Sequence, residues 1–198
     1  MSLPADPTAL PHRTLKAKLC LVGSRGVGKT SLLRRYVHNT FDDRYLTTIG
    51  TKVSKKEVAV RTESGTIWDV DLTVWDIMGE KGFRVLLPEA YFFGAAGILA
   101  VADVTRQETF TDIDDWIDGA TEAVGPLPVV LAANKSDLPG DERVPPGAAE
   151  ACAERLGGEV LYTSAKTSLH VDACFQALAA KIVAKHVAAR QALAAPAV

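Results

Sequence analysis

A glycine-rich stretch near the N-terminus carries the strongest chemical signal in the sequence. Residues 23–30 read GSRGVGKT and match the pattern GxxxxGK[ST], after an apolar run and before a segment of helical period. The glycines let backbone N–H groups close around an anion, and the following helix adds positive partial charge. Lys29 can reach the outer phosphates, and Thr30 can bind Mg²⁺. The stretch therefore predicts a nucleoside triphosphate site, the alternative being an ordinary glycine-rich turn.

Four further stretches indicate which base is bound and which class of protein binds it. They are Phe41–Gly50, Trp75–Glu80 (WDIMGE), Asn134–Asp137 (NKSD) and Ser164–Lys166 (SAK). Together with the glycine-rich stretch, here called the phosphate loop, they resemble the motifs of the Ras-like small GTPases over about residues 15–188. Within that superfamily the chain most resembles the Rab branch. A kinase that transfers phosphate to a small molecule is the alternative from another enzyme class, but it leaves NKSD and SAK unexplained.

The resemblance implies how a metal ion and the γ-phosphate would be held. Thr48 matches the threonine of the first switch, which meets Mg²⁺ and the γ-phosphate only while that phosphate exists. Asp76 can hold a Mg²⁺ water from the end of its strand, and Gly79 lets its N–H approach the γ-phosphate. The expected cofactors are GTP or GDP with Mg²⁺, and the expected metal ligands are Thr30, Thr48 and, through water, Asp76.

The resemblance also implies how guanine would be chosen. Phe41 would pack on the base, and Asp137 would accept hydrogen bonds from guanine N1–H and the 2-amino group, donors that adenine does not offer together. The N–H of Ala165 would donate to guanine O6. The full set of expected nucleotide contacts is Gly23, Arg25, Gly26, Val27, Gly28, Lys29, Thr30, Ser31, Phe41, Thr48, Gly79, Asn134, Lys135, Asp137, Ser164, Ala165 and Lys166.

Two of the expected catalytic residues depart from the family pattern. The catalytic set is Glu80, Lys29, Thr48 and Arg25; Glu80 replaces a water-orienting glutamine, and Arg25 replaces a small residue. An ionised glutamate can only accept hydrogen bonds, and it adds negative charge near the phosphate. Arg25 could pair with Glu80 and restrain hydrolysis, or it could act as a built-in arginine finger; the alternative is that each residue is a tolerated, solvent-facing substitution. We therefore expect a GTP/GDP switch with slow intrinsic hydrolysis, the alternative being a GTP-binding scaffold with negligible hydrolysis.

The composition of the chain argues against several other classes of protein. The chain has 198 residues with 22 Lys and Arg against 24 Asp and Glu, a net charge of −2 that argues against nucleic-acid binding. The longest nearly uncharged run, residues 90–102, is shorter than the roughly 18 residues that a membrane span needs. Three widely spaced cysteines predict neither a zinc site nor a disulfide framework, and they suit a reducing cytoplasm.

The hydrophobic pattern predicts the elements that position these motifs. Short apolar runs alternate with segments of helical period, which indicates an α/β fold, here the P-loop NTPase fold. We expect five helices on both faces of a six-stranded, mostly parallel sheet with one antiparallel edge strand. The expected strands are residues 15–22, 52–62, 70–76, 97–104, 128–133 and 159–163, with the second and third forming a hairpin. Phe110, Trp116 and Cys174 are expected in the core.

The chain ends and the partner surface complete the expectations. We expect a flexible leader at residues 1–14, one GTPase domain at 15–188, and a helix end with a short tail at 189–198. Activating proteins, exchange factors and effectors would bind through the switches. Trp75 and Tyr91 match two aromatics that Rab effectors read, but Val53 stands at the third position. The printed sequence shows neither prenylation nor myristoylation signals, so no direct lipid anchor is expected.

Overall fold

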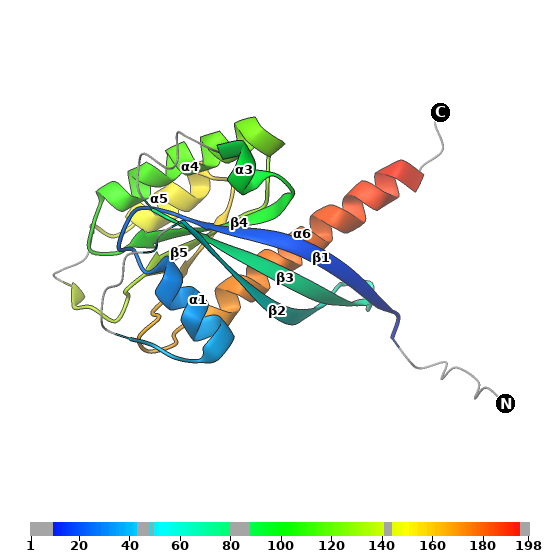
Figure 1. Ribbon diagram of the computed structural model, residues 1–198, viewed down its shortest axis with the longest axis horizontal. Coiled ribbons are helices and arrows are strands. Elements are labelled where there is room, and N and C mark those ends of the chain that lie inside the picture. The colour runs from blue at the N-terminus through cyan, green and yellow to red at the C-terminus, as the bar shows by residue number, and fades with distance from the viewer. Residues whose placement is uncertain (1–9, 43–47, 49, 80–87, 141–143, 195–198) are drawn as a thin grey trace.

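One mixed β-sheet organises the fold. The computed structural model describes residues 10–42, 48, 50–79, 88–140 and 144–194. The sheet has the strand order β2-β3-β1-β4-β5-β6 (Figure 1), with β2 antiparallel to β3 and all other pairs parallel. The prediction of a mostly parallel sheet with one antiparallel edge strand is therefore confirmed. The strands are β1 (His12–Val22), β2 (Thr51–Arg61), β3 (Ile67–Ile77), β4 (Ala95–Asp103), β5 (Val129–Asn134) and β6 (Glu159–Tyr162).

Helices cover both faces of this sheet, as the alternation of patterns predicted. The helices in the described residues are α1 (Lys29–His38), α3 (Pro88–Phe92), α4 (Glu108–Val124), α5 (Ala148–Arg155) and α6 (Val171–Ala194). Side chains of α1 and α6 pack into one core cluster, and those of α3, α4 and α5 pack into another on the opposite face (Figure 1). None of the helices in the described ranges is both long and apolar enough to cross a bilayer.

Strand alternation explains why there are two cores. On β1, Leu19 and Leu21 belong to the first cluster, whereas Cys20 and Val22 belong to the second. β4 and β5 lie inside the sheet and are buried along most or all of their length, which is why their sequences are continuously apolar. Phe110, Trp116 and Cys174 are all buried, as predicted. In the first cluster, Phe175 of α6 stacks on Tyr36 of α1 with ring centroids 3.9 Å apart.

Two strands begin three residues earlier than their apolar patterns predicted. β1 starts at His12 instead of residue 15, and β3 starts at Ile67 instead of residue 70, because His12 pairs with Ile67 and the ladder continues from there. Residues 12–14, expected in the leader, thus lie in the sheet, while residues 1–9 lie outside the described residues. Side-chain alternation cannot reveal backbone pairing between polar residues, and the polar start of β1 shows this. At the other end of the chain, α6 extends beyond the sheet (Figure 1).

The stacked pair Tyr36 and Phe175 generates a stability prediction. Phe175→Ala should lower the free energy of unfolding by about 3–5 kcal/mol, because it opens a cavity between α1 and α6. The matched control is Phe93→Ala, since Phe93 is 80% exposed and loss of its ring should change stability by less than about 0.5 kcal/mol. Urea unfolding monitored by circular dichroism checks both values, and equal losses in the two variants would contradict this packing account.

Candidate functional site

The described parts of the predicted motifs meet at one edge of the sheet. The glycine-rich loop follows β1, Asp76 is the penultimate residue of β3, NKSD begins at the last residue of β5, and SAK follows β6. These strands are parallel to one another, so their carboxyl ends lie at the same edge, which is where α/β folds place ligands. Phe41 lies half-buried against the first core cluster, on the chain that leaves α1.

Close backbone approaches explain two of the glycines in the loop. Gly23 has φ +133° and Gly28 has φ +101°, values that side chains strain to adopt. A Cβ atom at Gly23 would overlap the carbonyl oxygen of Val101, and one at Gly28 would overlap Nδ2 of Asn134. The loop therefore closes against β4 and β5 only with glycine at these positions. α1 starts directly after it, so the helix N-terminus opens into the loop.

Lys29 is a buried cation in this loop. The residue is 6% exposed, and Nζ donates to the carbonyl oxygens of Gly23 at 2.7 Å and Ser24 at 3.0 Å. Burial lowers the pKa of Lys29 to about 8, while Asp76 acts to raise it and Arg106 to lower it. A bound anion would favour the charged ammonium, so the loop is arranged to receive negative charge.

Asp76, Thr30 and Thr48 form an oxygen-rich cluster. Thr30 Oγ1 donates to Asp76 Oδ2 at 2.5 Å and lies 2.9 Å from Thr48 Oγ1. Asp76 is fully buried, and its Oδ1 has no hydrogen-bond partner among the described residues. Burial raises the pKa of Asp76, although the bond from Thr30 and the charges of nearby cations oppose the rise. A buried carboxylate with an unpaired oxygen beside two hydroxyls fits a hard cation such as Mg²⁺.

Asn134 ties three loops together. Its Nδ2 donates to Val27 O at 2.8 Å, and its Oδ1 accepts from Thr163 Oγ1 and from Ala165 N, both at 3.3 Å. Ser164 Oγ donates to Asp137 Oδ1 at 2.6 Å, which orients the exposed Asp137 carboxylate. The glycine-rich loop, NKSD and SAK therefore form one connected structure.

Sequence reasoning missed a second connection, which runs through Asp103. This buried carboxylate, at the end of β4, accepts from Lys135 Nζ at 2.5 Å and Arg106 Nε at 3.1 Å. Arg106 also donates to the carbonyl oxygen of Arg25 at 3.0 Å. Burial acts to raise the pKa of Asp103, but hydrogen bonds from Lys135 and Thr105 outweigh it and hold the pKa below its usual value. The signal in the sequence that could have revealed this connection is the position of Asp103, directly at the end of an apolar strand.

Two further side chains brace the loops without having been predicted. Arg35 Nε and Nη2 donate to the carbonyl oxygens of Ala165 at 2.9 Å and Lys166 at 3.1 Å, so α1 supports the SAK loop. Ser24 Oγ donates to Asp112 Oδ2 at 2.7 Å, which joins the glycine-rich loop to α4. Both contacts join residues far apart in the sequence, and neither Arg35 nor Asp112 belongs to one of the motifs.

The remaining predicted residues divide into those near the cluster and those that the structure leaves undescribed. A Cβ atom at Gly79 would lie 2.5 Å from Lys29 Nζ, so this glycine sits directly over the glycine-rich loop. Arg25 is exposed, while Val27 is buried, and Ser31 is half-buried on α1. Glu80 lies outside the described residues, as does most of Phe41–Gly50.

Comparisons with known proteins agree with the motifs. The Ras family model matches residues 18–184. GTP-binding protein YPTM2 of Zea mays is 36% identical over 169 residues, covering 83% of this chain and 79% of that protein. Ras-related protein RABD2a of Arabidopsis thaliana is 34% identical, with 83% and 79% covered. Ras-related protein Rab-13 of Bos taurus is also 34% identical, with 85% and 80% covered.

The buried charge of Lys29 generates a pH prediction. Because burial lowers its pKa from 10.5 to about 8, the unfolded chain binds more protons than the folded chain between these values. The free energy of unfolding of the nucleotide-free protein should therefore include a contribution from Lys29 that increases as the pH rises from about 8 to 10.5. Urea unfolding across this range should show that Lys29→Met removes the contribution, whereas Lys55→Met, at an exposed position, should keep it. Identical pH profiles for wild type and Lys29→Met would contradict the assignment.

Proposed function

This chain belongs to the Ras family, and we propose that it is a small GTP-binding protein that switches between GTP and GDP states. One observation carries the proposal: the side chain of Asn134 holds the phosphate loop and both base-recognition loops in a single connected site. Such a site can read the phosphates and the base of one nucleotide together. The names of two relatives, a GTP-binding protein of Zea mays and a Ras-related protein of Bos taurus, are consistent with it.

The base specificity rests on Asp137. Ser164 holds this carboxylate at its Oδ1, so the side chain is oriented before any base arrives. Guanine presents N1–H and a 2-amino group to such an acceptor, and adenine lacks that pair of donors. The Ala165 N–H donates to Asn134 Oδ1, with the two heavy atoms 3.3 Å apart, and we assign it to guanine O6 as a second acceptor that would share this donor. Phe41 supplies the apolar contact to the base.

The phosphate and metal contacts use the buried charges of the site. Lys29 and the N–H groups of the loop would hold the outer phosphates, and Gly79 would place its N–H beside the γ-phosphate. Thr30, Thr48 and, through water, Asp76 would hold Mg²⁺, which neutralises charge on the phosphates when bound. Thr48 belongs to the first switch, and its contact with Thr30 joins that switch to the glycine-rich loop.

Slow intrinsic hydrolysis follows from the residues at the γ-phosphate end. Glu80 cannot donate a hydrogen bond when ionised, so it cannot orient an attacking water as a glutamine does. Arg25 is exposed on the phosphate loop, with its carbonyl oxygen held by Arg106. We assign Arg25 to an ion pair that keeps Glu80 away from the water in the GTP state. Regulators and effectors would then act through the switches.

A cytoplasmic location completes the proposal. The three cysteines are buried and free, and burial raises the pKa of Cys20 and Cys174 to about 12 and that of Cys152 to about 11. Such thiols resist oxidation and disulfide exchange because they carry almost no thiolate at neutral pH. The support for a reducing compartment is that none of the three forms a disulfide.

Competition binding tests the guanine specificity. GTP and GDP should displace a fluorescent guanine nucleotide from the Mg²⁺-containing protein far better than ATP does. Asp137→Asn should weaken GTP binding by roughly 100-fold or more, because an amide N–H would face the guanine donors and leave them unpaired. The control Asp118→Asn removes the same charge at an exposed site on α4 and should leave the affinity unchanged. Equal affinity for ATP and GTP would reject the proposal.

Single-turnover GTP hydrolysis tests the assignment of Arg25. Arg25→Gly should raise the rate, because it releases Glu80. A double-mutant cycle with Glu80→Gln should show a coupling of about 0.5–3 kcal/mol. A fall in rate for Arg25→Gly would instead favour an arginine finger. Additive effects of the two substitutions would show that Arg25 and Glu80 do not interact. Hydrolysis too slow to detect in every variant would favour the scaffold alternative.

A further inference from the structure

One peptide group of the phosphate loop is held by a side chain from outside the loop. Arg106, which lies just before α4, donates from Nη2 to the carbonyl oxygen of Arg25 at 3.0 Å. We propose that Arg106 is a positioning residue for nucleotide binding, because this bond turns the N–H of Gly26 toward the outer phosphates of the nucleotide. The inference deepens the proposed function and rests on it.

The orientation of the peptide group between Arg25 and Gly26 carries the first step. The described residues contain no cis peptide bond, and in a trans peptide the C=O and the N–H point in opposite directions. The carbonyl oxygens of the two preceding residues turn toward Lys29 Nζ, whereas that of Arg25 turns to Arg106. The N–H of Gly26 therefore points away from Arg106 and back into the loop. No backbone carbonyl of the described residues accepts from it, so it is available to an anion.

The local sequence alone does not fix this orientation. Arg25 and Gly26 are the central residues of a turn, and Gly26 has φ +77°. A positive φ of this size is typical of the third residue of a type II turn, whereas a type I turn reverses the same peptide group and has φ of about −90° there. Glycine adopts both values without strain. An added interaction must therefore select one orientation, and the bond from Arg106 is the one that the structure describes.

Arg106 is itself held in place on both sides. Its Nε donates to Asp103 Oδ2 at 3.1 Å, and its carbonyl oxygen accepts from Thr109 Oγ1 at 2.7 Å. Asp103 is buried and also accepts from Lys135 of NKSD. Two nitrogens of one planar guanidinium thus join the end of β4 to the turn of the phosphate loop. A lysine has one side-chain nitrogen and cannot occupy both positions.

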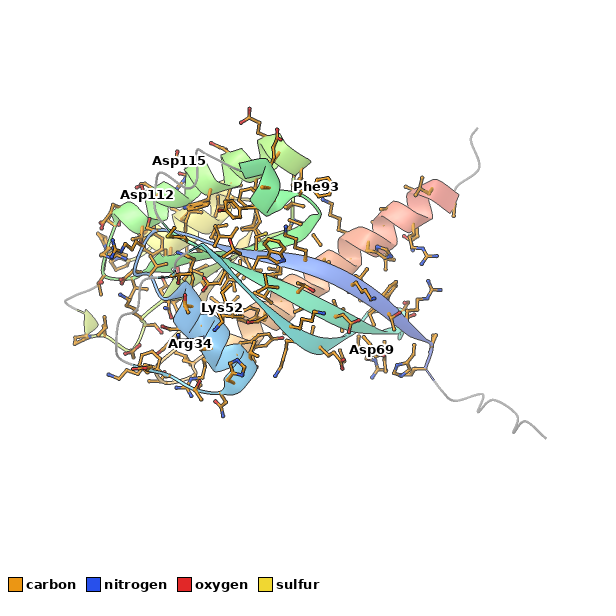
Figure 2. All side chains as sticks on the ribbon, viewed as in Figure 1. Arg34, Lys52, Asp69, Phe93, Asp112 and Asp115 are labelled. Carbon is orange, nitrogen blue, oxygen red and sulfur yellow. The ribbon has the colours of Figure 1, made fainter. Side chains whose placement is uncertain are left out.

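The phosphate loop keeps its other supports when Arg106 is changed. Ser24 Oγ donates to Asp112, which lies on α4 (Figure 2), at 2.7 Å. On the other side of the turn, the carbonyl oxygen of Val27 accepts from Asn134 Nδ2 at 2.8 Å. Neither bond reaches the peptide group at the centre of the turn. A substitution of Arg106 should therefore release that peptide group while the loop stays attached to α4 and β5.

Binding of nucleotides with and without outer phosphates tests the inference. Competition against a fluorescent guanine nucleotide compares a non-hydrolysable GTP analogue with GMP, which lacks these phosphates. Arg106→Gln should weaken binding of the analogue by about tenfold and that of GMP by about twofold or less, because a hydrogen bond to a charged acceptor is lost. Arg106→Lys keeps the charge but not both hydrogen bonds, so it should also weaken the analogue. The control Arg190→Gln removes the same charge at an exposed position near the end of α6 and should change neither affinity.

Amide NMR spectra of the complexes with the GTP analogue locate the effect. In wild type the Gly26 N–H should resonate at low field, because a short hydrogen bond to a charged acceptor deshields the proton. Arg106→Gln and Arg106→Lys should both move this resonance to higher field. The amides of β4 and α6 should keep their positions, which would show that the fold is intact.

Three results would overturn the inference. Full recovery of affinity in Arg106→Lys would show that the charge alone acts. A Gly26 resonance that Arg106→Gln leaves in place would show that another group sets the peptide orientation. Equal weakening of GMP and the GTP analogue would indicate a general loss of the site. Failure of wild type to bind any of these guanine nucleotides would instead reject the proposed function, and the inference with it.

Discussion

The side chain of Asn134 is the interaction on which the rest of the site depends. It is 2% exposed, and its amide bonds to the loop after β1 on one side and to the segment after β6 on the other. A buried amide left unpaired would be costly, so these bonds hold the loops in one arrangement. Gly28 must lack a side chain because Asn134 Nδ2 occupies that space. The glycine-rich loop, NKSD and SAK are thus joined through one shared side chain.

Buried charge is the second constraint. Among the described residues, Lys29 donates its hydrogen bonds to carbonyl oxygens, and Asp76 keeps one oxygen without a partner. Burial lowers the pKa of Lys29 and raises that of Asp76, so it favours the neutral form of each side chain. By contrast, Asp103 is neutralised by Lys135 and Arg106 and acts as structural support. The contrast separates the groups that would meet a ligand from those that only position the loops.

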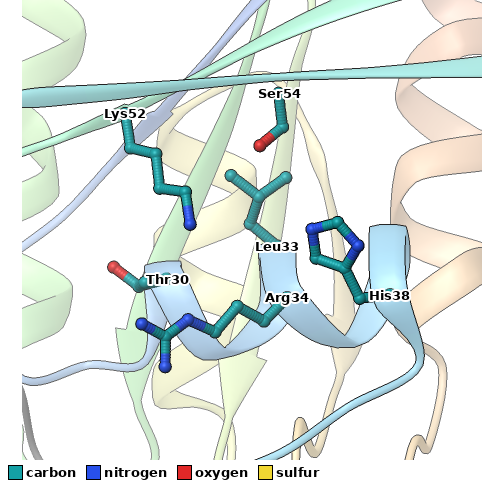
Figure 3. Close-up of a pocket in the computed structure, with 6 residues that line it drawn as sticks. All are labelled: Thr30, Leu33, Arg34, His38, Lys52 and Ser54. Atoms are coloured by element: carbon teal, nitrogen blue, oxygen red, sulfur yellow. The ribbon is translucent and has the colours of Figure 1, made fainter.

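The two faces of the sheet serve these loops differently. On one face α1 packs against α6 through Tyr36 and Phe175, and Arg35 of α1 reaches the SAK loop. On the other face α4 supports the phosphate loop through Asp112 and Ser24. Edge strand β2 has no neighbouring strand on its outer side in the described sheet, and its alternation sends Lys52 and Ser54 toward α1. Lys52 and Arg34 therefore lie on facing elements (Figures 2 and 3).

The sequence by itself determined the mixed sheet, the helices on both faces and the identity of the motif residues. Those features depend on local period and on short motifs, both of which can be seen along the chain. Only the tertiary structure decided that Asn134 joins three loops, that Asp103 and Arg106 brace the glycine-rich loop, and that Arg35 reaches the SAK loop. It also decided that β1 begins at His12, through pairing with Ile67. Each of these contacts joins residues that are far apart in the sequence and that strand order and helix packing bring together. A local sequence pattern carries no information about such contacts.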